Sequence, residues 1–389
     1  MRILHVIPSL NPAGGGPIEA VTRLGLEYRR QGANNVEILT LDPPEAEWIK
    51  TFPLPCHAIG PAFLKYSYTT RLVPWLRTHA PRFDLIVVNG VWQYTSFGVW
   101  RALHGTNSRY VVFTHGMLDP WFKRHYPLKH MKKWLYWPWA DYRVLRDAAA
   151  VLFTSEEEKR LARHSFWLYR CNERVINYGT AAAPPDDGSS ADRFRRAFPS
   201  VGNKRILLFL GRIHEKKGCE LLIRAYATLL RESPGARDLW HLVFVGPDTR
   251  DAYRRSLERL IDQTCPEGSV TWTGLLTGNL KWDAFRAADV FALTSHQENF
   301  GIAVAEALAC GVPVLLSNQV NIWREIADDN AGFIENDDDA GARTLLQKWA
   351  SLDEGAREAM RANALRCFST RFDVRHTSIQ LAETLQAVM

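Results

Sequence analysis

The stretch Asp289–Val314, DVFALTSHQENFGIAVAEALACGVPV, decides the fold of this 389-residue chain. It begins with a short apolar run, Val290–Leu293, passes through a polar loop and continues into a helix-length segment rich in alanine. A second apolar run, Val314–Leu316, follows directly. Short runs that are apolar throughout and joined by a helix are typical of parallel strands buried on both faces. The stretch therefore predicts a strand–helix–strand unit of a doubly wound sheet.

The same alternation of apolar runs and helix-length segments extends in both directions. A segment rich in Gly, Pro, Ser and Asp near residues 180–190 divides it into two series. We therefore predict an α/β chain with two doubly wound, Rossmann-like domains, residues 1–180 and 190–371. A final helix, residues 372–389, either caps the second domain or crosses back to the first. The predicted strands are Arg2–Ile7, Val36–Leu41, Leu85–Asn89, Tyr110–Thr114, Ala150–Thr154 and Val175–Asn177, then Arg205–Leu210, His241–Val245, Val270–Trp272, Val290–Leu293, Val314–Leu316 and Gly332–Ile334.

Composition places the chain among globular proteins of a reducing compartment. Hydrophobic residues make up 46% and charged residues 23%, which excludes long disorder. No run approaches the roughly 18 apolar residues of a membrane-spanning helix, and the apolar run at the N-terminus is too short for a signal peptide. The six cysteines lie far apart without a C-x-x-C pair, so we expect a cytoplasmic chain with no metal cluster.

Positive charge is concentrated in the first half. Residues 1–180 carry 23 Lys/Arg against 14 Asp/Glu, whereas residues 181–389 carry 25 against 28. The segment Trp121–Trp139 combines five Lys/Arg with seven aromatic residues and no acid. This mixture suits peripheral contact with an anionic membrane, such as the inner face of the plasma membrane. It also suits binding of an acidic acceptor. It also fits a partly buried helix with solvated lysines. No recognised nucleic-acid motif accompanies it, so we do not expect nucleic acid as a partner.

Residues directly after strands are candidates for ligand binding, because ligands of doubly wound sheets bind beyond the carboxyl ends of strands. The loop NPAGGGP, with Gly15 and Gly16, allows close approach of a ligand to the backbone. It lacks the G-x-G-x-x-G pattern, so it is no dinucleotide fingerprint. The turn LGRIHEKKG, with Gly211, Arg212 and Lys217, offers two cations to a phosphate. Taken singly, either could be an ordinary turn.

Polar residues also follow the strands that end near residues 114 and 293. His115 and Gly116 follow the first of these strands. A lone histidine in this position is often a structural residue. Glu298 lies in the loop after the second, and Glu306 lies a little over one turn into the next helix. Carboxylates in these places can accept hydrogen bonds from sugar or ribose hydroxyls. Two glutamates eight residues apart are uninformative on their own.

Together, these motifs resemble glycosyltransferase family 4. The resemblance rests on VFVGPD, TGLL, the stretch quoted first and the G-R…K-G turn, all in family order and spacing. In the first half, NGVWQYTSFGVW and HGMLDPW resemble the branch that builds bacterial exopolysaccharide or O-antigen chains. The resemblance implies a GT-B fold with two domains facing a cleft and a last helix that crosses back to the first domain. It implies a retaining hexosyltransferase that uses a nucleotide-sugar, with a UDP-sugar favoured and a GDP-sugar second.

The resemblance also implies the roles of particular residues. Arg212 and Lys217 match the pair that neutralises the donor diphosphate, and Glu306 matches the glutamate that binds the ribose. Glu298 matches the residue that contacts hydroxyls of the transferred sugar, and His115 a hydrogen-bonding histidine near that sugar. The remaining donor-binding residues implied by the resemblance are Gly15, Gly16, Gly211, Gly274, Leu275, Asn299, Phe300, Gly301 and Ile302.

The implied acceptor is a lipid-linked or oligosaccharide intermediate of cell-surface polysaccharide synthesis. The GT-B fold lacks the metal-holding D-x-D of other transferases, and we find no convincing one here, so we predict that no metal or other cofactor is needed. Two other functions remain open: another GT-B enzyme, such as a sugar-nucleotide epimerase or a glucan synthase, and a non-catalytic nucleotide-binding scaffold. The scaffold is disfavoured because all four charged residues of the family are present: Arg212, Lys217, Glu298 and Glu306.

Overall fold

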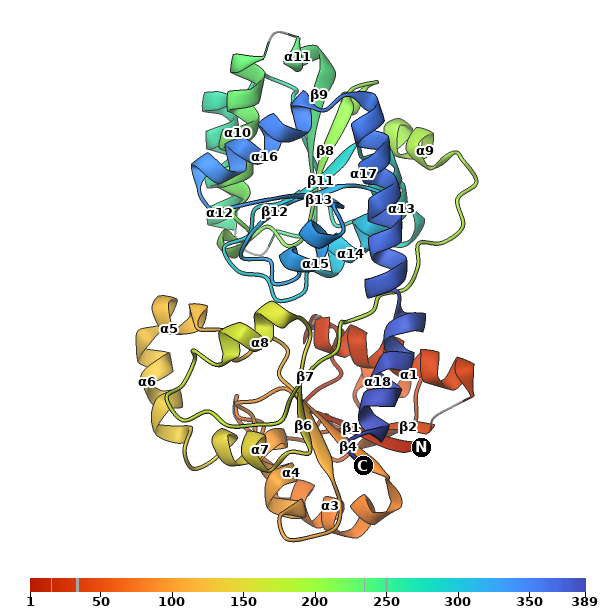
Figure 1. Cartoon of the computed structure of the whole chain (residues 1–389), viewed down its shortest axis with the longest axis vertical. Coiled ribbons are helices and arrows are strands. Elements are labelled where there is room, and N and C mark those ends of the chain that lie inside the picture. The colour runs from red at the N-terminus through yellow and green to blue at the C-terminus, as the bar shows by residue number, and fades with distance from the viewer. Residues whose placement is uncertain (15, 33–34, 234, 249–250) are drawn as a thin grey trace. The chain divides into compact units, whose positions relative to one another are not determined.

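The chain forms two compact α/β units in a computed structural model (Figure 1). The structure describes residues 1–14, 16–32, 35–233, 235–248 and 251–389. The first unit comprises Met1–Thr180 together with Val374–Met389, and the second comprises Ala181–Asp373. Among the described residues, no helix is both long and apolar enough to cross a membrane.

The first unit is built on a seven-stranded parallel sheet in the order β3-β2-β1-β4-β5-β6-β7. The central strands β4, β5 and β6 are buried along their whole length, whereas the edge strands β3 and β7 are not. This burial explains the continuous apolar runs of the sequence. The strands are β1 (Arg2–Ile7), β2 (Asn35–Thr40), β3 (Cys56–Ala58), β4 (Leu85–Asn89), β5 (Tyr110–Phe113), β6 (Ala150–Phe153) and β7 (Glu173–Val175).

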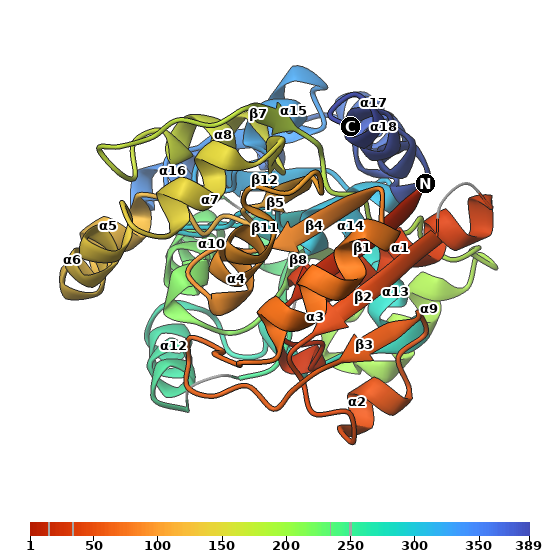
Figure 2. The same ribbon diagram turned by 90° about the horizontal axis from the view of Figure 1, so that it is seen from below.

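Helices cover both faces of this sheet. One apolar core lies under α1 and α18, and the other under α3, α4 and α7. The last helix, α18, packs against α1 and joins this unit by way of a hydrogen bond from the Val374 N–H to the Thr180 carbonyl (3.0 Å). Figure 2 shows α5 and α6 at the edge of the unit. The helices are α1 (Gly16–Gln31), α2 (Glu47–Lys50), α3 (Leu72–His79), α4 (Tyr94–Leu103), α5 (Trp121–His125), α6 (Pro127–Tyr136), α7 (Asp141–Asp147), α8 (Glu156–Ala162) and α18 (Val374–Gln386), with short 3-10 turns η1 (Pro12–Gly14) and η2 (Ala80–Arg82).

The second unit is built on a six-stranded parallel sheet in the order β10-β9-β8-β11-β12-β13. Its central strands are again buried, and the edge strands β10 and β13 are half-buried. The strand order reverses between β8 and β11, which are neighbours in the sheet. The strands are β8 (Arg205–Leu210), β9 (Trp240–Val245), β10 (Val270–Gly274), β11 (Val290–Leu293), β12 (Val314–Ser317) and β13 (Gly332–Glu335).

Two groups of helices enclose the second sheet. On one side α10 packs against α12 and α16, and on the other α9 packs against α13 and α14 against α17 (Figure 1). The helical elements are α9 (Ser190–Ala197), α10 (Cys219–Glu232), α11 (Ala236–Leu239), α12 (Asp251–Thr264), α13 (Gly278–Ala287), α14 (Ile302–Ala309), α15 (Trp323–Asp328), α16 (Asp339–Ser351) and α17 (Glu354–Cys367), with turns η3 (Pro199–Val201) and η4 (Glu215–Lys217) and a π-helical turn η5 (Phe368–Phe372).

The observed architecture agrees with the predicted fold class, including the last helix, which returns to the first unit. Strand β3 was absent from the prediction because it has three residues, each only half-buried, and so leaves no apolar run. The predicted strand Val175–Asn177 is displaced, since β7 is Glu173–Val175. As an edge strand it has no continuous apolar signal that would mark its start.

Candidate active site

The topological switch point of the second unit brings two predicted ligand loops together. Strands β8 and β11 pair directly, with Leu207 opposite Val290. The basic turn with Lys217 follows β8, and the loop with Glu298 follows β11. Because parallel strands end at the same edge of a sheet, both loops lie where doubly wound proteins bind their ligands.

Hydrogen bonds fasten these two loops to each other. The Thr294 hydroxyl donates to the Gly218 carbonyl (2.8 Å), and the His296 N–H donates to the Lys216 carbonyl (2.9 Å). Gly218 has a positive φ of 59°, and a Cβ there would lie 2.1 Å from the Thr294 carbonyl oxygen. This position therefore requires glycine, both for its left-handed backbone and for the close contact between the loops.

Lys217 and Glu298 form an ion pair across this contact. Both side chains are largely buried, with 16% and 20% of their surface exposed. Burial by itself would raise the pKa of the Glu298 carboxyl, but Lys217, Lys216 and the Asn299 amide outweigh it and lower the pKa. Glu298 is therefore ionised at neutral pH, and the switch point holds one cation and one anion side by side.

The start of α14 lies beside the Glu298 side chain. Gly301 precedes the helix in a left-handed conformation (φ 74°), and a Cβ there would lie 3.3 Å from the Glu298 side chain. The first N–H groups of a helix, here those of Ile302 and Ala303, have no acceptor within the helix and attract anions. Asn299 accepts a hydrogen bond from Asn321 (3.3 Å).

Phe300, the other residue of this loop, is buried. Its ring lies edge-on to Phe372 with centroids 5.6 Å apart, so the side chain anchors the loop in the core. A backbone hydrogen bond also anchors the loop, because the Glu298 N–H donates to the Gln319 carbonyl (2.9 Å).

Glu306 lies in the buried part of α14 and pairs with Lys281 of α13. The Lys281 ammonium is 2.7 Å from the carboxylate, which is 4% exposed. Helix α13 follows β10, whose last residue is Gly274, and Leu275 in the connecting loop is 64% exposed. The structure thus pairs Glu306 with the helix that follows Gly274 and Leu275, two residues that the resemblance implies for donor binding. Lys281 had no signal in the sequence, because a lone lysine on a helix is commonplace.

The remaining predicted residues of the second unit lie in the turn after β8. The Gly211 N–H donates to the Val245 carbonyl (2.9 Å), which fixes the start of the turn. Arg212 has an exposed side chain. It therefore shares a loop with Lys217 but does not share the buried environment of the Lys217–Glu298 pair.

In the first unit, His115 follows β5 in a left-handed conformation (φ 50°). Its Nε2–H donates to the Asn89 side-chain oxygen (3.2 Å), and its Nδ1 shares a hydrogen bond with the Tyr178 hydroxyl. Burial, helped by nearby His5, lowers the pKa of His115 to about 3. The imidazole is therefore neutral at neutral pH, which suits a hydrogen-bonding role.

A buried glutamate, Glu158, holds the loop that carries His115. Its carboxylate accepts hydrogen bonds from the Thr114 hydroxyl (2.6 Å), the Gly116 N–H (2.5 Å) and the Thr154 N–H (2.7 Å). The Ser155 hydroxyl accepts from the Glu158 N–H (3.0 Å) and caps the start of α8. The glutamate side chain, however, bonds the neighbouring strand ends instead of completing a capping box.

The glycine-rich loop is described in part. Gly16 is the exposed first residue of α1, so its helix offers free N–H groups. Gly15 lies outside the described residues. In the part of the chain that the structure describes, no three His, Cys, Asp or Glu side chains gather into a possible metal site. Metal independence stays a prediction.

Comparison with known proteins identifies both halves of the chain. Residues 190–366 match the family Glycosyl transferases group 1, and residues 15–179 match the family Glycosyl transferase 4-like domain. Each half of the chain therefore belongs to a glycosyltransferase family, and the two units are the Rossmann-like domains of the GT-B fold. The predicted class of enzyme is confirmed at the level of the family.

Relatives support this membership over part of their length. The D-inositol 3-phosphate glycosyltransferase of Kineococcus radiotolerans is 36% identical over 154 residues, which are 39% of this chain and 35% of the relative. That of Streptomyces avermitilis is 31% identical over 202 residues, 51% of this chain and 43% of the relative. The matches thus span less than half of either relative. Among solved structures, HepE from Anabaena in complex with UDP shares the fold over 100% of both chains, with a TM-score of 0.80 and 20% identity.

Proposed function

We propose that the chain is a retaining hexosyltransferase that moves a sugar from a nucleotide-sugar to a lipid-linked or oligosaccharide acceptor in cell-surface polysaccharide synthesis. The observation that carries the proposal is the Lys217–Glu298 pair at the switch point of the second unit. A nucleotide-sugar presents a diphosphate and hydroxyl groups side by side. A cation beside an anion matches both, since Lys217 can bind phosphate oxygens and Glu298 can accept from sugar hydroxyls.

The proposed chemistry follows from where charge develops. As the bond from the anomeric carbon to the diphosphate breaks, negative charge builds on the leaving phosphate. Lys217 and Arg212 stabilise that charge, assisted by the amides at the start of α14. The acceptor hydroxyl bonds to the anomeric carbon on the same face and its proton passes to the leaving phosphate, so the configuration is retained. Glu306 binds the ribose, and neutral His115 bonds the sugar in exchange for its hydrogen bond to Asn89 or Tyr178.

UDP is the nucleotide to test first. It is present in the structures of HepE from Anabaena, together with glucose or as UDP-glucose. The experiment is a thermal-shift panel of UDP, GDP, ADP and TDP, because a ligand that binds the folded state raises its stability by RT ln(1 + [L]/Kd). Turnover of the selected nucleotide-sugar, with NMR of the product anomer, then tests transfer.

The outcomes separate the proposed function from its alternatives. Retention at the anomeric carbon with release of the nucleoside diphosphate supports a retaining transferase. An inverted product contradicts it, and a rearranged sugar without an acceptor indicates an epimerase. Transfer of glucose only onto a glucan chain indicates a glucan synthase. A nucleotide-dependent thermal shift with no turnover of any sugar donor indicates a scaffold.

We further propose that the segment Trp121–Trp139 contacts an anionic membrane. Its helix α6 buries none of its residues and exposes Leu128 (73%), Met131 (57%) and Leu135 (65%) along one stripe. Apolar side chains at this spacing, with lysines beside them, are typical of helices that lie in a membrane interface. Replacing these three residues with Gln should reduce co-sedimentation with anionic vesicles about 10-fold or more, because each buried side chain contributes about 1.5–3 kcal/mol.

The control for vesicle binding is Leu365→Gln, an exposed leucine on α17 of the second unit. It should pellet with anionic vesicles as the unaltered protein does. Equal binding of all three proteins, or equal binding to neutral and anionic vesicles, would show that α6 is an ordinary solvated helix.

A further inference from the structure

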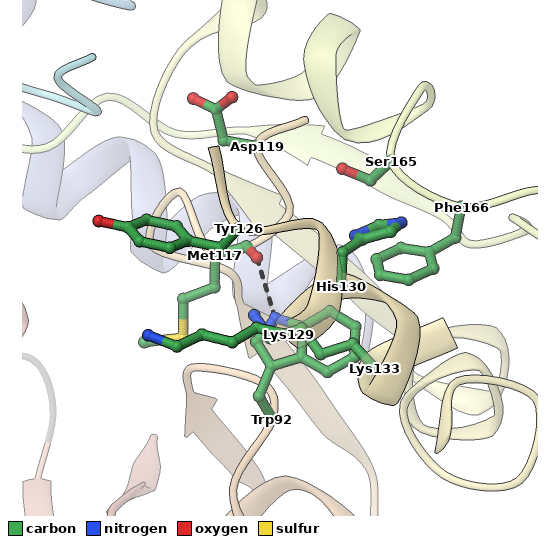
Figure 3. A pocket seen from close by; sticks show the side chains of 9 residues that line it. All are labelled: Trp92, Met117, Asp119, Tyr126, Lys129, His130, Lys133, Ser165 and Phe166. Carbon is green, nitrogen blue, oxygen red and sulfur yellow. Dashed lines mark hydrogen bonds between the residues drawn. The ribbon is translucent and has the colours of Figure 1, made fainter. Parts of the chain in front are cut away.

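A cavity of about 310 Å³ lies beside α6 in the first unit (Figure 3). Its walls come from the loops after β4 and β5, from α6 and from the segment after α8. Three aromatic rings, Trp92, Tyr126 and Phe166, and two lysines, Lys129 and Lys133, line it. This α6 pocket therefore combines flat apolar surfaces with positive charge.

Helix α6 is oriented so that its polar side faces the protein. The stripe of Leu128, Met131 and Leu135 is exposed, whereas His130 and Lys133 on the opposite side are half-buried and line the pocket. Helices on the surface of globular proteins place their apolar face inward. The reversed orientation of α6 costs apolar burial and presents cations to a cavity, which points to a ligand for those cations.

Aromatic rings hold both lysines at the pocket. The Lys129 ammonium lies 4.6 Å from the centre of the Tyr126 ring, and the Lys133 ammonium lies 4.4 Å from that of Trp92. Contacts of this length are cation–π interactions, which position a lysine without neutralising it. Lys129 and Lys133 are four residues apart, so they lie on one face of the helix, one turn from each other.

Among the charged side chains that line the pocket, the two lysines outnumber the one carboxylate, Asp119. Asp119 accepts a hydrogen bond from the Trp121 N–H (2.8 Å), so its carboxylate is engaged in shaping the loop. Burial, with Lys123 and Lys133 nearby, lowers the pKa of His130. Burial also lowers the pKa of Lys133, an effect that buried Asp141 opposes. An anion in the pocket would favour the charged form of this lysine.

The wall of the pocket is continuous with the His115 loop. The Trp92 indole N–H donates to the Met117 carbonyl (2.9 Å), drawn as the dashed line in Figure 3. Met117 is two residues from His115, so a molecule that fills the pocket lies on the same loop as the histidine assigned to the reacting sugar. Because the proposed function assigns the donor nucleotide to the second unit, the ligand of this pocket in the first unit is a part of the acceptor.

We propose that the α6 pocket binds a phosphorylated acceptor sugar, with its phosphate between Lys129 and Lys133 and its ring against Trp92. The proposal rests on the proposed glycosyl transfer and names the chemical class of the acceptor. The phosphate has two possible sources: a free sugar phosphate, or a sugar joined to a lipid through a phosphate or diphosphate. Both present the same group to the lysines.

The test compares variants on the two sides of α6. Lys129→Met and Lys133→Met remove the charge and keep most of the chain, and Lys132→Met removes an exposed charge of the same helix. The probes are glucose, glucose 1-phosphate and farnesyl diphosphate glucose below its micelle concentration, titrated by calorimetry. Each pocket lysine contributes a charge-assisted hydrogen bond, so its loss should weaken binding of a phosphorylated probe about 10-fold or more.

Each outcome decides the proposal. Binding of either phosphorylated probe, weakened in the two pocket variants and unchanged in Lys132→Met, supports it. Binding of the farnesyl probe alone assigns the phosphate to a lipid-linked sugar. Failure of both probes to bind, or equal binding to all variants, overturns it. The thermal shift with the donor nucleotide, measured on the same samples, should persist in the pocket variants. Its absence from the unaltered protein would instead count against the proposed function.

Discussion

The Lys217–Glu298 pair allows a prediction that separates stability from activity. Replacing Lys217 with Met leaves a carboxylate without its cation in a site where the two side chains are 16% and 20% exposed. Surface pairs contribute about 0–1 kcal/mol, whereas breaking a fully buried pair costs about 3–5 kcal/mol. A pair of intermediate burial should cost about 2 kcal/mol of unfolding free energy. Glu298→Gln should cost less, because the amide can still bond Lys217.

The double variant distinguishes the pair from its catalytic role. Lys217→Met with Glu298→Gln removes both charges, so its destabilisation should be smaller than the sum by about 1–2 kcal/mol. Turnover should not recover with stability. Loss of one group that stabilises a leaving phosphate lowers the rate about 100-fold or more. Denaturant unfolding measures the first quantity, and release of nucleoside diphosphate from the donor measures the second.

Two results would refute this reasoning. Strictly additive effects on unfolding free energy would show that the two side chains do not interact in solution. Turnover of Lys217→Met within a few-fold of the unaltered protein would show that the lysine does not act on the diphosphate. Lys50→Met, which removes an exposed charge of α2 in the first unit, is the control for a general loss of positive charge.

Further predictions concern loop packing and pH. Gly218→Ala should reduce stability by more than about 3 kcal/mol, because its Cβ would lie 2.1 Å from the Thr294 carbonyl oxygen. Gly235 also has a positive φ but faces open space, so Gly235→Ala should cost about 1–2 kcal/mol. Denaturant midpoints compare the two variants. Buried His5 has a pKa of about 4, below its ordinary 6.5, so the unfolded chain takes up its proton first as pH falls. The contribution of neutral His5 to the free energy of unfolding is fully present above pH 6.5 and is lost toward pH 4. Between pH 7 and pH 5 the loss should be about 2 kcal/mol. His5→Asn should flatten that dependence, and an unchanged slope would contradict the assignment.

Much of the fold and the place of the site were predictable because they depend on local patterns. Strands buried on both faces have continuous apolar runs, as in Leu85–Asn89 and Val290–Leu293, so their positions could be read directly. Ligands of parallel sheets bind beyond strand ends, so Lys217 and Glu298 were candidates before their contact was known.

What the sequence did not predict depends on contacts between distant segments. The pairing of Glu306 with Lys281 and the hold of Glu158 on the His115 loop join residues from separate elements, and neither residue type is unusual in a helix. The α6 pocket was hidden for another reason. The mixture of lysine and tryptophan in Trp121–Trp139 fitted a membrane helix, an acceptor site or a solvated helix equally well, and only the orientation of α6 showed that Lys133 faces a cavity.

The most direct test of a donor site in the second unit is calorimetric titration with the nucleoside diphosphate that gives the largest thermal shift. We expect one nucleoside diphosphate to bind per chain. Glu306→Gln should weaken it about 10-fold or more, because two charge-assisted bonds to the ribose become neutral ones. Glu335→Gln, on the edge strand β13, should bind as the unaltered protein does. Equal affinity of the Glu306→Gln variant and the unaltered protein would contradict the ribose assignment, and no binding of any nucleotide would contradict the donor site itself.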